Sequence, residues 1–155
     1  MKTLILYATK YGAAAEIAQR IAEKLNGADT HNLKNPIPDL TEYDCIIIGS
    51  SVYAGMFRRE AKAFFAKTGD TLLQKKLGLF ASALSSDGAS KIFAKNVPDN
   101  ILKSSKSAIL LGGIFDPGKA NFIERFIIKI ITKQTGRLGV IDSTRIDSFA
   151  GEMLR

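Results

Sequence analysis

The fold of this chain is decided by the stretch Leu4-Ile5-Leu6-Tyr7-Ala8-Thr9-Lys10-Tyr11-Gly12-Ala13-Ala14-Ala15-Glu16-Ile17. Its first residues form a short apolar run that is typical of a buried strand. A tight turn containing Gly12 follows, and apolar residues then recur at four-residue spacing (Ile17, Ile21, Leu25), which predicts a helix. Where a strand turns tightly into a helix, free backbone N–H groups and the helix dipole attract an anion. The stretch therefore predicts an anion site at the start of the helix.

The composition is that of a globular chain with an excess of positive charge. With 155 residues, 46% of them hydrophobic and 24% charged, we expect one domain over residues 1–155. No apolar run approaches the ~18 residues of a membrane span, and residues 4–8 are too short for a signal peptide, so we expect a cytoplasmic protein. A single cysteine excludes a disulfide framework and a cysteine-based zinc site, and no metal is expected. The formal net charge of +7 favours an anionic ligand, an anionic membrane surface or nucleic acid.

Predicted strands and helices alternate along the chain. The β-branched run at residues 44–49 predicts a central strand that is buried on both faces, and residues 28–33 predict a weak strand near an edge. Asn26-Gly27 is expected to close the first helix, and Ser143 to cap the last. The other strands are expected at residues 2–7, 76–84 and 107–113, and the helices at residues 12–26, 57–67, 121–134 and 143–154, with a loop at 50–57 and one or two short helices between 85 and 106 that break at Pro98.

This alternation predicts an α/β fold with a parallel sheet. Five strands with helices on both faces form a three-layer sandwich, for which we expect the flavodoxin-like strand order 2-1-3-4-5. In that order the ligand crevice lies beyond the carboxyl ends of strands 1 and 3, where the direction of winding reverses.

The turns exclude several ligands that this architecture can bind. A dinucleotide site requires Gly-x-Gly-x-x-Gly after the first strand, but the turn has only Gly12, and a Walker A loop is absent. A receiver domain requires clustered acids after strand 1 and an aspartate at the end of strand 3, where this chain has Thr9 and Gly49-Ser50. Cys45 lies in the middle of a strand, without the basic loop of a phosphatase thiolate, and is expected to be a small core residue.

Of the ligands considered for this architecture, a mononucleotide with a terminal phosphate remains. The hydroxyl of Thr9, the tight turn at Gly12 and the N–H groups of residues 10–14 are suited to one phosphate, and Lys10 adds charge or points to water. The expected phosphate residues are Thr9, Lys10, Tyr11, Gly12, Ala13 and Ala14.

Two further loops are suited to a flavin ring, which requires a flat partner and backbone groups at its edge. The loop after strand 3 supplies Ser51, Val52, Tyr53, Ala54 and Gly55, with Tyr53 as the stacking candidate and the Ala54-Gly55 peptide at the edge of the ring. Phe57 and Phe115 are rivals of Tyr53 for the stacking role. The loop after strand 4 supplies Leu84, Ser85, Ser86, Asp87 and Gly88 for the polar pyrimidine edge, although Asp87 also suits a turn cap.

Several segments together carry a family resemblance: residues 1–6, the turn from Thr9 to Gly12, Tyr43-Asp44 leading to Ile48-Gly49, Gly112-Gly113 with Pro117, and residues 124–133. With these segments the chain resembles flavodoxin-fold FMN proteins over essentially its whole length. It is most similar to the menaquinone-dependent protoporphyrinogen dehydrogenase family. The resemblance implies FMN as cofactor, a porphyrinogen as electron donor and menaquinone as electron acceptor.

The helix expected from Asn121 to Gln134 has one apolar and one basic face. Phe122, Phe126 and Ile130 are spaced for the apolar face, while Arg125, Lys129 and Lys133 recur at four-residue steps. Such a helix either lies peripherally on the inner face of an anionic membrane or packs on the sheet with its basic face in solvent. Both interpretations are open at the level of sequence.

The sequence shows no acid/base pair or nucleophile, so the catalytic residues are unknown and His31 is assigned no chemistry. This pattern fits a flavoprotein, because the cofactor performs the redox chemistry and the protein binds and tunes it. We expect an FMN-dependent oxidoreductase, with an anionic porphyrinogen as a possible substrate and a quinone or redox protein as partner. The alternative is an electron carrier for an acidic redox partner, without a small-molecule substrate. A nucleic-acid partner is not expected, because aromatic and basic residues do not alternate as in a stacking platform.

Overall fold

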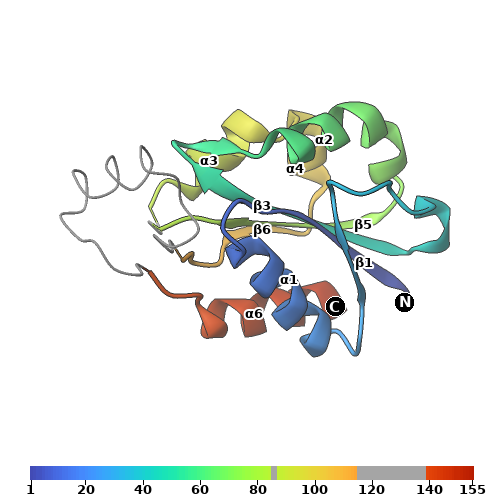
Figure 1. The fold of residues 1–155 in the computed structure, drawn as a ribbon. Helices are drawn as coiled ribbons and strands as arrows, with labels where there is room; N and C mark the ends of the chain where they lie inside the picture. The colour runs from blue at the N-terminus through green and yellow to red at the C-terminus, as the bar shows by residue number, and fades with distance from the viewer. Residues whose placement is uncertain (85–86, 115–138) are drawn as a thin grey trace.

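The computed structural model describes residues 1–84, 87–114 and 139–155 of the chain. Its centre is a parallel sheet in the order β2-β1-β3-β5-β6 (Figure 1). The short strand β4 turns back antiparallel on β3 and stands outside this order. The expected order 2-1-3-4-5 is confirmed, with β5 and β6 as its fourth and fifth parallel strands and β2 at an edge. The strands span Thr3–Ala8 (β1), Asp29–Asn32 (β2), Cys45–Tyr53 (β3), Met56–Phe57 (β4), Lys76–Ser82 (β5) and Ser107–Leu110 (β6).

Helices cover both faces of the sheet, as the alternating pattern predicts (Figure 1). The helices α2 (Arg59–Leu72), α3 (Ala89–Asn96) and α4 (Asp99–Ser104) lie on one face, and α1 (Ala13–Lys24) and α6 (Ser143–Leu154) on the other. Because successive side chains of a strand point to opposite faces, each strand contributes to two cores. Leu4 and Leu6 pack in the cluster of α2 and α3, whereas Ile5 packs in that of α1 and α6.

Two details of the expected elements are corrected. The strand expected to end at Gly49 continues to Tyr53, because its last residues pair with β5 and β4, and the loop expected at residues 50–57 is therefore largely a hairpin. Ser143 is the first residue of α6 and Asp142 is its cap, since the Asp142 carboxylate accepts a hydrogen bond from the Arg145 N–H at 3.0 Å. The helix expected at residues 121–134 lies outside the described residues.

Two other expectations about the termini of helices agree with the structure. Asn26 and Gly27 both have positive φ after α1, and the Gly27 N–H donates to the Ala22 carbonyl at 2.9 Å. The two short helices α3 and α4 are separated at Pro98. Among the described residues, none of the helices has the length and hydropathy of a membrane-spanning segment.

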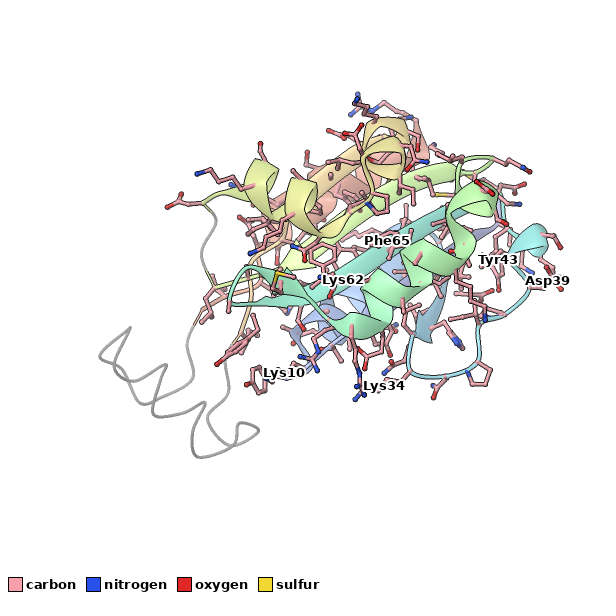
Figure 2. All side chains as sticks on the ribbon, turned by 90° about the horizontal axis from the view of Figure 1, so that it is seen from above. Lys10, Lys34, Asp39, Tyr43, Lys62 and Phe65 are labelled. Atoms are coloured by element: carbon pink, nitrogen blue, oxygen red, sulfur yellow. The ribbon has the colours of Figure 1, made fainter. Side chains whose placement is uncertain are left out.

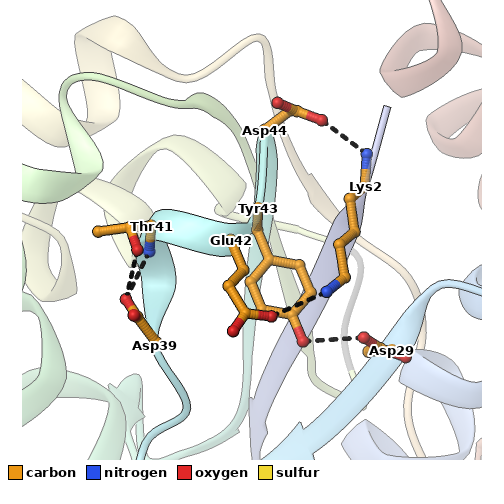
Figure 3. Close-up of polar contacts among 7 residues, drawn as sticks. All are labelled: Lys2, Asp29, Asp39, Thr41, Glu42, Tyr43 and Asp44. Carbon is orange, nitrogen blue, oxygen red and sulfur yellow. Dashed lines mark hydrogen bonds and ion pairs between the residues drawn. The ribbon is translucent and has the colours of Figure 1, made fainter.

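A polar cluster joins the amino ends of β1, β2 and β3, at the opposite end of the sheet from the expected crevice (Figure 3). The Lys2 ammonium forms an ion pair with Glu42 at 3.0 Å and lies 4.7 Å from the centroid of the Tyr43 ring. The Tyr43 hydroxyl donates to Asp29 at 2.8 Å, and this hydrogen bond raises the pKa of Tyr43 above its ordinary value. These contacts hold the amino ends of three strands together, and they do not involve the carboxyl ends, where the crevice is expected.

Candidate functional site

A pocket lies at the carboxyl ends of four neighbouring parallel strands. Its lining comes from the turn after β1, the end of β3, the end of β5 with the residues after it, and the residues after β6. In an open parallel sheet the crevice for a ligand lies at this end, where β1 and β3 separate the two halves of the winding. The lining residues are Tyr11, Ala13, Ser51, Val52, Tyr53, Ser82, Ala83, Leu84, Gly113 and Ile114.

The turn between β1 and α1 is built by two hydrogen bonds. The Thr9 hydroxyl accepts from the Gly12 N–H at 2.9 Å, and Ser51 Oγ on β3 accepts from the Lys10 N–H at 3.1 Å. Gly12 has φ 96° at the position before α1, a conformation that side chains with a Cβ rarely adopt. The first intrahelical bond runs from the Glu16 N–H to the Gly12 carbonyl, so the first-turn donors that this ladder does not use are those of Ala13, Ala14 and Ala15. The backbone N–H groups of Lys10 and Gly12, which were expected to bind the phosphate, donate instead to Ser51 and Thr9 in this structure.

The wall on the β3 side is a tight hairpin. Val52 and Tyr53 pair with Phe57 and Met56, and the two residues between the strands, Ala54 and Gly55, both have positive φ, of 51° and 77°. Positive φ at both central residues is the mark of a type I′ turn, the turn that matches the twist of paired strands. The Ala54-Gly55 peptide, expected at the edge of a ring, is therefore held in one defined turn.

Asn96 anchors this hairpin from the end of α3. The residue is 5% exposed; Oδ1 accepts from the Phe57 N–H at 2.8 Å, and Nδ2 donates to the Gly55 carbonyl at 2.9 Å. Sequence reasoning missed Asn96. A signal was present, because Asn96 follows Ile92 by four residues and so lies on the apolar face of a short helix. A polar residue on a buried face requires partners, and here they are two backbone groups of the hairpin and the Ile92 carbonyl of α3, to which Nδ2 donates at 2.7 Å.

Ser50 and Ser51 connect the hairpin to the elements beside it. Ser50 is fully buried, and its Oγ accepts from the Arg58 N–H at 2.9 Å, just before α2 begins. Ser51 accepts from Lys10 in the neighbouring turn. Two consecutive serines thus join the end of β3 to the start of α2 and to the turn before α1.

Aromatic rings and one ammonium group gather where the turn and the hairpin face each other. The Lys10 Nζ lies 4.3 Å from the centroid of the Tyr53 ring and 5.5 Å from that of Tyr11, and both tyrosines line the pocket. Phe57, the second candidate for the stacking role, is buried and packs edge-on against Phe93, with 5.9 Å between the ring centroids, so it belongs to the core. The other rival, Phe115, lies outside the described part of the chain.

The loops after β5 and β6 complete the pocket. Leu84 lines it, while Ser85 and Ser86 are not among the described residues, Asp87 is exposed, and Gly88 precedes α3 with φ 76°. Sequence reasoning did not include Ser82, Ala83, Gly113 and Ile114. The pair Gly112-Gly113 was the available signal, because a Cβ on Gly113 would lie 2.8 Å from the Ala83 carbonyl carbon.

Titratable groups outside the pocket do not form a catalytic constellation in the described ranges. Cys45 is fully buried in β3, and burial raises the pKa of its thiol above the ordinary value, which makes it unreactive. His31 lies on the edge strand β2. No group of three or more His, Cys, Asp or Glu side chains among the described residues is placed to hold a metal ion.

A parallel sheet with a crevice at this switch point is typical of the flavodoxin-like class of α/β proteins. The flavodoxin domain family matches residues 4–139, and the chain belongs to this family. It is 25% identical over 150 residues to protoporphyrinogen IX dehydrogenase [quinone] of Escherichia coli K12, covering 88% of this chain and 81% of that protein.

Solved structures show the same fold. The flavodoxin of Fusobacterium nucleatum bound to flavin mononucleotide is 20% identical with a TM-score of 0.55, and the similarity covers 99% of this chain and 98% of that one. A flavoprotein of Lactobacillus acidophilus in complex with FMN is 16% identical with a TM-score of 0.57, over 70% of this chain and 92% of that one.

Proposed function

We propose that this protein binds FMN in the pocket at the carboxyl ends of β1 and β3 and functions as an FMN-dependent oxidoreductase. The observation that carries the proposal is the meeting of the Thr9–Gly12 turn with the Tyr53 hairpin on two sides of one pocket. One wall offers a helix N-terminus and the other an aromatic ring with an ordered peptide. The two solved flavodoxin-fold proteins that contain FMN support this choice of ligand.

The residues present suit the parts of FMN. The first turn of α1 supplies backbone N–H groups to a phosphate, whose charge suits the helix N-terminus, and Ala13 of this turn lines the pocket. Tyr53 offers a flat face, and the Ala54-Gly55 peptide offers backbone groups to the edge of a ring. A site of this kind binds phosphate through the backbone, so it does not depend on an arginine.

FMN supplies the transfer of electrons when it is bound, and the chain supplies binding and orientation. The hydrogen bond from Lys10 N–H to Ser51 fixes the spacing of the phosphate turn and the hairpin. Asn96 holds the Gly55 carbonyl, which belongs to the peptide that directly follows Ala54-Gly55, so the end of the turn is fixed before the cofactor arrives. The buried serine Ser50 keeps the base of the hairpin in register with α2.

We propose protoporphyrinogen oxidation with a quinone as acceptor as the specific activity. The similarity to the Escherichia coli dehydrogenase over most of the chain supports this choice. The net charge of +7 suits a substrate that carries carboxylates. The basic, amphipathic sequence at residues 121–134 is suited to an anionic membrane, where a quinone is found.

A second candidate function is that of an electron carrier for an acidic partner. The same net charge of +7 favours it, because complementary charge guides the encounter of two proteins. The two functions differ in whether a small organic molecule is turned over.

The first test is the visible absorption spectrum of the purified protein after incubation with FMN and desalting. Flavin bands that remain with the protein support the proposal, and a colourless protein refutes it.

Gly12→Ala adds a Cβ at φ 96° and is expected to weaken FMN binding, whereas Gly151→Ala on α6 is expected to leave FMN affinity unchanged. Porphyrin fluorescence after anaerobic addition of protoporphyrinogen and a quinone then separates the dehydrogenase from the carrier, since only the former gives a rate above the enzyme-free control.

A further inference from the structure

A lysine ammonium lies beside two tyrosines that line the pocket proposed for the flavin. Lys10 Nζ lies 4.3 Å from the centroid of Tyr53, the proposed stacking residue, and 5.5 Å from the centroid of Tyr11. Figure 2 shows Lys10 at the margin of the molecule, well separated from Lys62 and Phe65 of α2. Cations are attracted to the faces of aromatic rings, so two tyrosines favour this position of the ammonium group.

Both ends of this contact are anchored. The Lys10 N–H donates to Ser51 Oγ at 3.1 Å, which ties the origin of the lysine side chain to the end of β3. Tyr53 begins the hairpin whose turn is bonded to Asn96 through Gly55. Because the Lys10 backbone is tied to the end of β3 and Tyr53 to the hairpin, the lysine side chain begins close to the wall that carries Tyr53.

We propose that Lys10 tunes the reduction potential of the bound flavin by favouring its reduced form. This inference rests on the proposed FMN site. Two electrons and one proton convert the neutral oxidised ring to a reduced ring with one negative charge, and a nearby positive charge stabilises the charged product. Lys10 is a tuning residue and takes no part in proton transfer. A raised potential suits a flavin that accepts electrons from an organic donor.

The measurement is the affinity for FMN in two states, oxidised and dithionite-reduced, for the wild type and for Lys10→Met. We expect Lys10→Met to weaken binding of reduced FMN about tenfold more than binding of oxidised FMN, which lowers the two-electron potential by ~30 mV. Lys10→Arg keeps the charge and is expected to retain a ratio near that of the wild type. Lys67→Met removes an equal charge about 12 Å along α2 from its start and is expected to change neither affinity.

The outcomes separate the two proposals. If the wild type retains no FMN, the proposed function fails and this inference fails with it. If FMN binds but Lys10→Met changes both affinities by the same factor, Lys10 is a phosphate ligand only, and the inference is overturned while the proposed function stands. An equal fall in potential for Lys67→Met also overturns it, because the effect is then one of net charge.

Discussion

Replacing Asn96 by alanine tests whether the hairpin beside the pocket is held by one buried side chain. The substitution removes the acceptor of the Phe57 N–H and a donor to the Gly55 carbonyl, at 2.8 and 2.9 Å. A buried polar group that is left unpaired costs about 1–3 kcal/mol. The Phe57 bond is buried and the Gly55 bond is partly buried, so water replaces some of the latter. We therefore expect a loss of about 2–4 kcal/mol in the free energy of unfolding.

Urea unfolding followed by far-ultraviolet circular dichroism measures this loss. With an m value of about 2 kcal/mol/M, the midpoint is expected to fall by about 1–2 M. The experiment is done without FMN, because a ligand that binds only the folded state adds its own stabilisation. Asn35→Ala, at an exposed position after β2, is the matched control and is expected to change stability by less than about 0.5 kcal/mol. A midpoint for Asn96→Ala within about 0.2 M of the wild type, at unchanged m value, would refute the reasoning.

Two further predictions concern the core. A Cβ on Gly49 would lie 2.0 Å from the Phe80 ring, so Gly49→Ala is expected to lower the free energy of unfolding, and with it the urea midpoint, by about 3 kcal/mol. A Cβ on Gly151 of α6 meets open space, so Gly151→Ala is expected to raise the free energy of unfolding by about 0.5–1 kcal/mol. Equal midpoints for the two variants would contradict this. Burial raises the pKa of Cys45, so its contribution to stability is full below the ordinary thiol pKa of ~8.5 and falls as the pH rises above it. The thiol is expected to react with a disulfide reagent at pH 8 only after urea is added, and rapid reaction of the native protein would count against burial.

The sheet was predictable because its order depends on features that a sequence displays directly. The apolar runs of β1 and β3 and the four-residue spacing in α1 each have a strong period, and alternation of strands with helices then restricts the topology. The strand ends were less predictable. Residues 50–53 look like a loop because Gly49, Ser50 and Ser51 have low strand propensity, yet pairing with β4 and β5 extends β3 to Tyr53.

The sequence predicted the loops that form the candidate site, but it did not predict the side chains elsewhere in the fold that hold these loops in place. Thr9 and Gly12 stand in the turn after β1 and Tyr53 ends β3, at the end of the sheet where the fold places ligand residues. Asn96 is distant in sequence from the hairpin that it holds, and no local pattern connects the two. Ala54 also defies local rules, since a non-glycine residue at φ 51° is unfavourable alone and persists because the hairpin and Asn96 fix the turn.

Two polar side chains, one near the end of β3 and one at the end of α3, bond the walls of the pocket to other elements of the fold. Ser51 joins the phosphate turn to β3, and Asn96 joins α3 to the turn of the hairpin, so each wall of the pocket is bonded to another element of the fold. A pocket built this way keeps its shape before a ligand arrives, which lowers the ordering cost of binding. The same bonds explain why Lys10 and Tyr53 remain in contact, and why a change at Asn96 is expected to reach the site even though Asn96 does not line the pocket.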